Sequence, residues 1–69
     1  MNLVRFYRKE NNLTQEELSR LCGVSRLTIV NIEHGSTPRC WLIVKLSSVL
    51  HVSPLQLFPD DFQEPPATH

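Results

Sequence analysis

The side chains of this chain that could do nucleophilic or metal chemistry are its cysteines and histidines: Cys22, Cys40, His34, His51 and His69. Zinc sites in short chains use paired ligands such as C-x-x-C, and neither that pair nor a Cys/His cluster is present in the sequence. No neighbouring sequence feature would lower the pKa of either cysteine. We therefore expect no metal site, no cofactor and no catalytic activity.

The elements that would position functional side chains are short and helical. Apolar residues recur at helical spacing, and no segment alternates apolar and polar residues over the length of a strand. Five helices are predicted, at about residues 3–11, 15–22, 26–34, 38–50 and 54–58. The sequence predicts an all-α fold, a compact five-helix bundle, in residues 1–58.

Residues with capping chemistry begin and end these segments. Thr14 and Glu17 have the spacing of a capping box, and Ser53, Pro54 and Gln56 combine a cap, a first-turn proline and a glutamine. The other predicted boundaries are Asn2 and Asn12 around the first helix, Ser25 before the third, Gly35 after it, and Thr37-Pro38 before the fourth.

Residues 15–34 hold two predicted helices joined by a very short turn. Gly23 supplies the left-handed position that a turn of about 3–4 residues needs, and Ser19 is small where the helix axes come closest. The apolar residues that would fix the pair onto the bundle are Leu18, Cys22, Val24, Ile29 and Ile32. This pattern is typical of a helix-turn-helix.

A longer set of motifs extends over residues 3–58. These are Leu13-Thr14-Gln15-Glu16-Glu17-Leu18, Gly23-Val24-Ser25, Ile29-x-x-Ile32-Glu33-x-Gly35, Pro38, Lys45-Leu46 and Leu50-x-Val52-Ser53. On these residues the chain resembles the Cro and lambda-type repressor (XRE) helix-turn-helix DNA-binding family. The resemblance implies a lambda-repressor-like domain and a sequence-specific transcriptional regulator, with repression as the expected direction.

The resemblance implies that the helix beginning at Arg26 lies in the DNA major groove, with base contacts from Arg26, Leu27, Thr28 and Asn31. The Arg26 guanidinium matches the O6 and N7 acceptors of guanine, and Asn31 can pair with adenine or reach a phosphate. Leu27 would suit a thymine methyl group. The simpler interpretations are that Arg26 is a solvated surface charge and that Leu27 is an exposed or dimer-contacting leucine.

Contacts to the DNA backbone are expected from Gln15, Ser25, His34, Ser36, Thr37 and Arg39. Gln15 matches a family position at the start of the second helix, where backbone N–H groups should also face a phosphate. The resemblance further pairs Arg8 with Glu33 in a partly buried salt bridge that belongs to the scaffold.

Charge is unevenly distributed. Residues 1–58 hold seven basic and four acidic residues, a net charge of +3, whereas residues 59–69 hold three acidic and no basic residues. We expect this acidic, proline-containing tail to be flexible and either to restrain non-specific binding or to dock on a partner. Because one small module reads few bases, we expect a homodimer on a palindromic operator. The family resemblance implies recognition helices about 34 Å apart.

The alternative function is an antitoxin-like or adaptor module that uses the same scaffold to bind a protein. The candidate anchors for such a partner or for the homodimer are Trp41, Leu55, Phe58 and Phe62. The simpler interpretation is that these side chains only cap the small core. No apolar run approaches the roughly 18–20 residues that a membrane span needs. We expect a cytoplasmic protein without membrane contact, nucleoid-associated when bound to double-stranded DNA.

Overall fold

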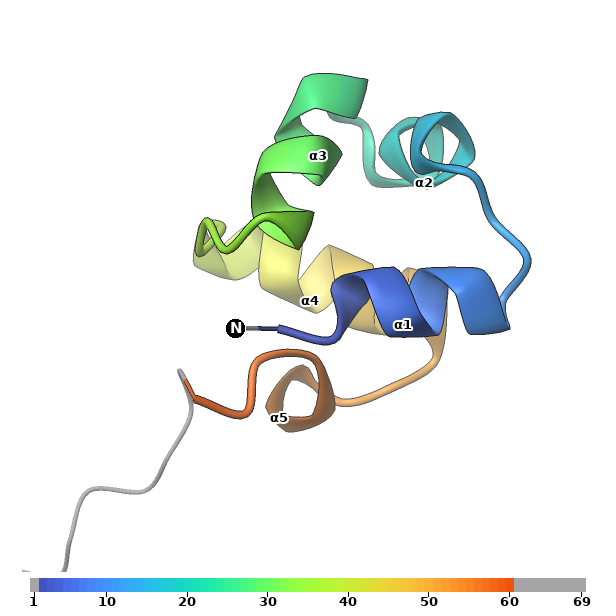
Figure 1. The fold of residues 1–69 in the computed structure, drawn as a ribbon. Coiled ribbons are helices and arrows are strands. Elements are labelled where there is room, and N and C mark those ends of the chain that lie inside the picture. The colour runs from blue at the N-terminus through green and yellow to red at the C-terminus, as the bar shows by residue number, and fades with distance from the viewer. Residues whose placement is uncertain (1, 61–69) are drawn as a thin grey trace, which may run out of the picture.

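The computed structural model describes residues 2–60, which form five helices and no strand. They are α1 (Val4–Glu10), α2 (Gln15–Cys22), α3 (Arg26–Glu33), α4 (Cys40–Leu50) and α5 (Pro54–Leu57). Helices α2 and α3 pack together, α1 and α4 lie next to each other across the middle, and α5 packs under α4 (Figure 1). The predicted all-α architecture is confirmed. The predicted flexible tail lies almost wholly in residues 61–69, outside the described residues.

Short-range hydrogen bonds begin the helices at the predicted caps. The Thr14 hydroxyl accepts from the Glu17 N–H at 3.0 Å, and the Glu17 carboxylate accepts from the Thr14 N–H at 2.9 Å. Ser53 and Gln56 form the same reciprocal box at the start of α5. Gly23, at φ +72°, ends α2 in the left-handed conformation that the short turn requires.

Two predicted helix starts were wrong. Helix α4 begins at Cys40, because Arg39 has an extended ψ of 158° and therefore keeps Pro38 out of the first helical turn. Helix α1 begins at Val4, with Leu3 in the cap position. The Asn2 side chain instead ties this end of α1 to α3, since its amide donates to the Ile32 carbonyl at 2.7 Å while its oxygen accepts from the Val4 N–H at 3.2 Å.

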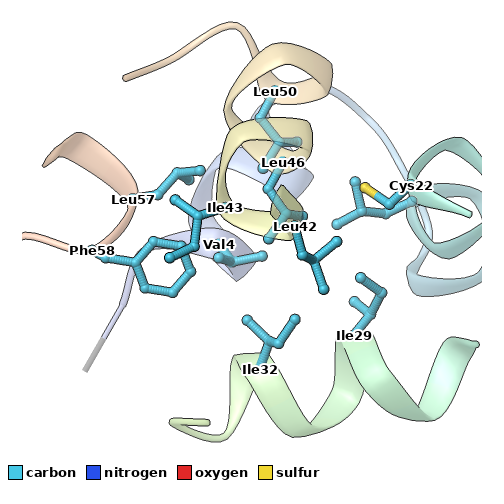
Figure 2. Packing of buried hydrophobic residues seen from close by; sticks show 11 residues of the cluster. Val4, Cys22, Ile29, Ile32, Leu42, Ile43, Leu46, Leu50, Leu57 and Phe58 are labelled. Carbon is cyan, nitrogen blue, oxygen red and sulfur yellow. The ribbon is translucent and has the colours of Figure 1, made fainter. Parts of the chain in front are cut away.

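A single apolar core connects the helix-turn-helix to the other helices. Ile29 and Ile32 point from α3 toward Leu42 of α4 (Figure 2). The buried cluster consists of Val4, Leu18, Cys22, Ile29, Ile32, Leu42, Ile43, Leu46, Leu50, Leu57 and Phe58. Ser19 is also buried, and its hydroxyl donates to the Glu16 carbonyl at 2.7 Å, so the close approach of α2 leaves no unpaired polar group there.

Phe58 was wrongly predicted as an exposed anchor. It is fully buried and lies beside Val4 and Ile43 (Figure 2), because the chain turns at the end of α5 and directs the ring under the core. Trp41 and Leu55 are exposed as expected, on α4 and α5. Phe62 lies outside the described residues. No helix between residues 2 and 60 is long and apolar enough to cross a membrane.

Candidate nucleic-acid interface

Helix α3 has one buried face and one open face. Ile29 and Ile32 anchor it in the core, while Leu27 is 65% exposed and Asn31 is also exposed. Asn31 follows Leu27 by four residues and Thr28 by three, so that it is a neighbour of both on the helix surface. Of the side chains expected to contact bases, Arg26, Leu27 and Asn31 are therefore exposed, and Thr28 is half-buried.

The leading end of α3 is fixed by Ser25. Its hydroxyl oxygen accepts from the Thr28 N–H at 3.2 Å and lies 2.9 Å from the Thr28 hydroxyl. Since one of these hydroxyls donates to the other, one hydroxyl hydrogen stays available for an external acceptor. The cap thus stabilises the helix and still leaves a donor at its outer end.

A chain of hydrogen bonds connects this end of α3 to α1. The Arg26 guanidinium donates to the Gln15 side-chain oxygen at 3.3 Å, and the Gln15 amide donates to Glu33 at 3.1 Å. Glu33 in turn accepts from Arg8 at 2.6 Å and 3.3 Å, which is the pairing expected from the sequence. Gln15 therefore links the exposed guanidinium to a buried ion pair, and its amide keeps one free N–H.

The Arg8–Glu33 pair is buried and fully hydrogen-bonded. Arg8 also donates to the Leu13 carbonyl at 2.8 Å, and no buried side-chain nitrogen or oxygen among residues 2–60 is without a partner. A buried ion pair is tolerated only when its remaining hydrogen-bonding groups are satisfied, which is the case here. The pair fixes α1 against α3 and, through Gln15, against α2.

The first turn of α2 carries two acidic side chains next to Gln15. Glu17 is turned back into the capping box, and the hydrogen bonds from the Thr14 backbone and side chain, with the nearby charge of Arg20, hold the pKa of its carboxyl below the ordinary value. Glu16 lies 3.7 Å from Arg20 on the solvent side. Both carboxylates thus have local partners, which reduces their repulsion of an approaching anion.

The residues after α3 form the rim of a shallow groove of about 400 Å³. Ser36, Thr37 and Arg39 line it together with Thr28 and Asn31 of α3. Trp41 also lines it and is 57% exposed. The loop side chains expected to contact phosphates therefore adjoin the open face of α3, whereas His34 lies in a separate hollow beside α1.

Two exposed residues were not among the candidate site residues assigned from the sequence. Val44 is 60% exposed and lies three positions after Trp41 on α4, which extends the apolar surface there. The signal was present, because the core-facing pattern of α4 leaves Trp41 and Val44 outside it. Arg5 lines the hollow that also contains His34, and its contribution depends on the packing of α1 against α3.

Cys22 lies where the sequence predicts it. Cys22 is in the core, and desolvation by burial raises the pKa of its thiol, which opposes thiolate formation. Cys40 is exposed at the start of α4. Within the described part of the chain no three His, Cys, Asp or Glu residues are grouped closely enough to hold a metal ion.

Comparison with known proteins gives consistent matches. A helix-turn-helix family model matches residues 4–57. An uncharacterized HTH-type transcriptional regulator of Methanocaldococcus jannaschii is 40% identical over 58 residues, which cover 83% of this chain and 88% of that protein. Another from Methanothermobacter thermautotrophicus is 36% identical over 63 residues, covering 86% of this chain and 91% of the relative.

Proposed function

Because this chain belongs to the XRE-type helix-turn-helix family of DNA-binding transcriptional regulators, we propose that it binds a palindromic operator sequence-specifically and represses transcription as a homodimer. The observation that carries the proposal is the solvent-exposed side of α3, where Leu27 and Asn31 are exposed and Arg26 is exposed in the first turn. Such a face fits the major groove, which admits one α-helix.

Arg26 is proposed to read guanine through its planar guanidinium. Its hydrogen bond to Gln15 is long, at 3.3 Å, and exposed, so that it can rearrange toward a base at little cost. Asn31 would pair with adenine or reach a phosphate, Leu27 would contact a thymine methyl group, and Thr28 would contribute its hydroxyl. Sequence preference would therefore depend on this one face.

The residues around α3 are proposed to hold the DNA backbone. Gln15 would donate its remaining N–H to a phosphate, with Ser25 beside it. The loop residues Ser36, Thr37 and Arg39 would contact phosphates from the other side, and His34 would do so from the end of α3. These contacts position the protein on the duplex without reading the sequence.

The experiment that tests this function is selection of bound duplexes from a random DNA pool at low salt. We expect enrichment of a palindrome with half-sites roughly one helical turn apart. Arg26→Ala should then cost about 1–3 kcal/mol of binding free energy and relax preference at one base pair. The matched control Arg39→Ala should weaken binding to all sequences alike. Uniform losses in both variants would refute the assignment of base readout to Arg26.

The exposed side chains of Trp41 and Val44, which we call the α4 surface, are proposed as dimer contacts. They are 57% and 60% exposed and lie on the same side of α4. Paired copies would double the phosphates and bases engaged, which a small domain needs to distinguish its operator from random DNA. Trp41→Gln should therefore weaken self-association on operator DNA in sedimentation experiments, whereas Leu21→Gln, which changes an exposed leucine of α2, should not.

The α4 surface also supports a second candidate, an adaptor that binds another protein. Large exposed apolar side chains often mark protein interfaces. The adaptor function is favoured over DNA binding if the random pool yields no enriched motif at low salt and if the parent chain and Trp41→Gln are both monomeric.

A further inference from the structure

A polar hollow of about 430 Å³ lies beside the Arg8–Glu33 pair. Arg5 and Arg8 of α1, Gln15 of α2 and Glu33 and His34 at the end of α3 line it. A neighbouring hollow shares Arg5, Glu33 and His34 and extends to Asn2 and Gly35. Arg5 and His34 therefore lie between the two hollows, on a surface continuous with Gln15.

The hollow contains one uncompensated positive charge. Glu33 is neutralised by Arg8 at 2.6 Å and also accepts from Gln15. Arg5 is exposed and makes no ion pair with any residue between positions 2 and 60. An anion that entered here would meet the Arg5 guanidinium, whose fork of N–H donors suits a phosphate.

The hydrogen bonding of His34 determines what its ring offers to such an anion. Its Nδ1 lies 2.8 Å from the Val30 carbonyl oxygen, which can only accept, so Nδ1 carries a hydrogen. The other ring nitrogen, Nε2, is then a lone pair in the neutral ring and an N–H donor in the protonated ring. Only the protonated form can donate to an anion through Nε2.

We propose that Arg5 and His34 form a subsite for one phosphodiester of the DNA backbone, and that His34 takes up a proton when the phosphate binds. The proposal rests on the proposed DNA-binding function. It adds a phosphate contact made by α1 to the phosphate contacts proposed for α2 and α3. The charged groups facing His34 are Arg5 and Arg8 from α1 and Glu33 from its own helix, while Gln15 and Asn2 are neutral. Arg8 and Glu33 offset each other, whereas Arg5 opposes a second positive charge on His34. A bound phosphate adds the negative charge that outweighs this repulsion and favours protonated His34.

The salt dependence of binding tests the role of Arg5. Affinity for the duplex enriched from the random pool is measured over a range of NaCl concentrations for the full chain and for Arg5→Gln. The slope of log affinity against log salt is negative, and losing one phosphate contact should reduce its magnitude by about one per protomer. Arg20→Gln is the matched control, because it removes the same charge from α2 in a hollow lined by Leu13, Glu17 and Leu21. Equal slopes in the two variants would overturn the subsite.

The pH dependence of binding tests the role of His34. Affinity for the same duplex should rise several-fold between about pH 8 and about pH 5.5, the range in which histidine titrates. His34→Gln should abolish that rise, and the control His51→Asn, at the end of α4, should retain it. A rise that persists in His34→Gln would overturn the proton uptake, as would a flat profile of the full chain.

These outcomes separate the subsite from the function on which it rests. If the full chain binds no duplex at low salt, the proposed function and the subsite fail together. If the chain enriches a motif and Arg26→Ala alters it, but Arg5→Gln behaves like Arg20→Gln, only the subsite fails. Competition at constant ionic strength by inorganic phosphate should be weak, because the phosphodiester is held by the rest of the duplex; strong competition would mean that the hollow is a site for free phosphate instead.

Discussion

Two arginine–glutamate ion pairs among residues 2–60 differ in burial, since one is buried and the other is exposed to solvent. Arg8 and Glu33 lie 2.6 Å apart, with side chains only 10% and 4% exposed, and they join α1 to α3. Arg20 and Glu16 lie 3.7 Å apart within α2, with side chains 74% and 68% exposed. The first pair has hydrogen-bonding neighbours in Leu13 and Gln15, whereas the second faces water.

The difference shows that burial, more than charge, decides what a pair does. Water screens the Arg20–Glu16 pair, so its loss costs little free energy. Arg8 and Glu33 are both desolvated by burial, so removing one side chain leaves the charge of the other unpaired in a poorly solvated position. Because Gln15 and Arg26 are bonded in series to this buried pair, it also orients the end of α3 that we propose to contact bases.

The largest expected effect comes from Glu33→Ala. The stranded Arg8 charge should lower the free energy of unfolding by about 3–5 kcal/mol, which is a large fraction of the total for a small domain. Urea denaturation followed by circular dichroism measures this loss. A variant as stable as the parent would mean that the buried pair contributes no more to the free energy of unfolding than the exposed pair does, which would contradict the difference argued here.

The double variant Arg8→Met/Glu33→Leu serves as the control for that interpretation. It removes both charges and keeps apolar volume, so it should unfold at a higher urea concentration than Glu33→Ala. If the double variant is the less stable of the two, the cost arises from lost packing and hydrogen bonds and not from an unpaired charge.

A smaller effect is expected from the exposed capping box of α2. Thr14→Ala removes the side-chain cap and should lower the free energy of unfolding by about 1 kcal/mol in urea denaturation.

The same capping box predicts a pH dependence of stability. The Thr14 hydrogen bonds, with the charge of Arg20, lower the pKa of Glu17 in the folded state. Their stabilisation is therefore complete above the pKa of an unfolded glutamate and is lost as the pH falls through the lowered pKa. Glu17→Gln should therefore reduce the loss of stability between neutral and acidic pH. An unchanged loss would contradict this linkage.

The smallest effect is expected from the exposed pair. Arg20→Gln should change the free energy of unfolding by no more than about 0.5 kcal/mol, and the change should shrink further in high salt. Thermal unfolding at low and high NaCl concentrations measures both. A loss near that of Glu33→Ala would show that exposure does not separate the two pairs.

Features that depend on residues close together in the chain could be predicted from the sequence. The boxes of Thr14 with Glu17 and of Ser53 with Gln56, the Ser25 cap and the Gly23 turn all formed as predicted. The start of α4 was misplaced, because Pro38 is compatible with both a first turn and an extended loop, and only the backbone at Arg39 distinguishes them.

The chain by itself determined the number of helices, their caps and the helix-turn-helix spacing, because each is set by residues a few positions apart. Tertiary packing alone decided that Phe58 enters the core and that Arg5 joins His34 in one hollow. It also placed Gln15 between Glu33 and Arg26, residues 18 and 11 positions away. Periodicity shows that a side chain is apolar or polar on a given face, but the partner across that face is known only once the helices have packed.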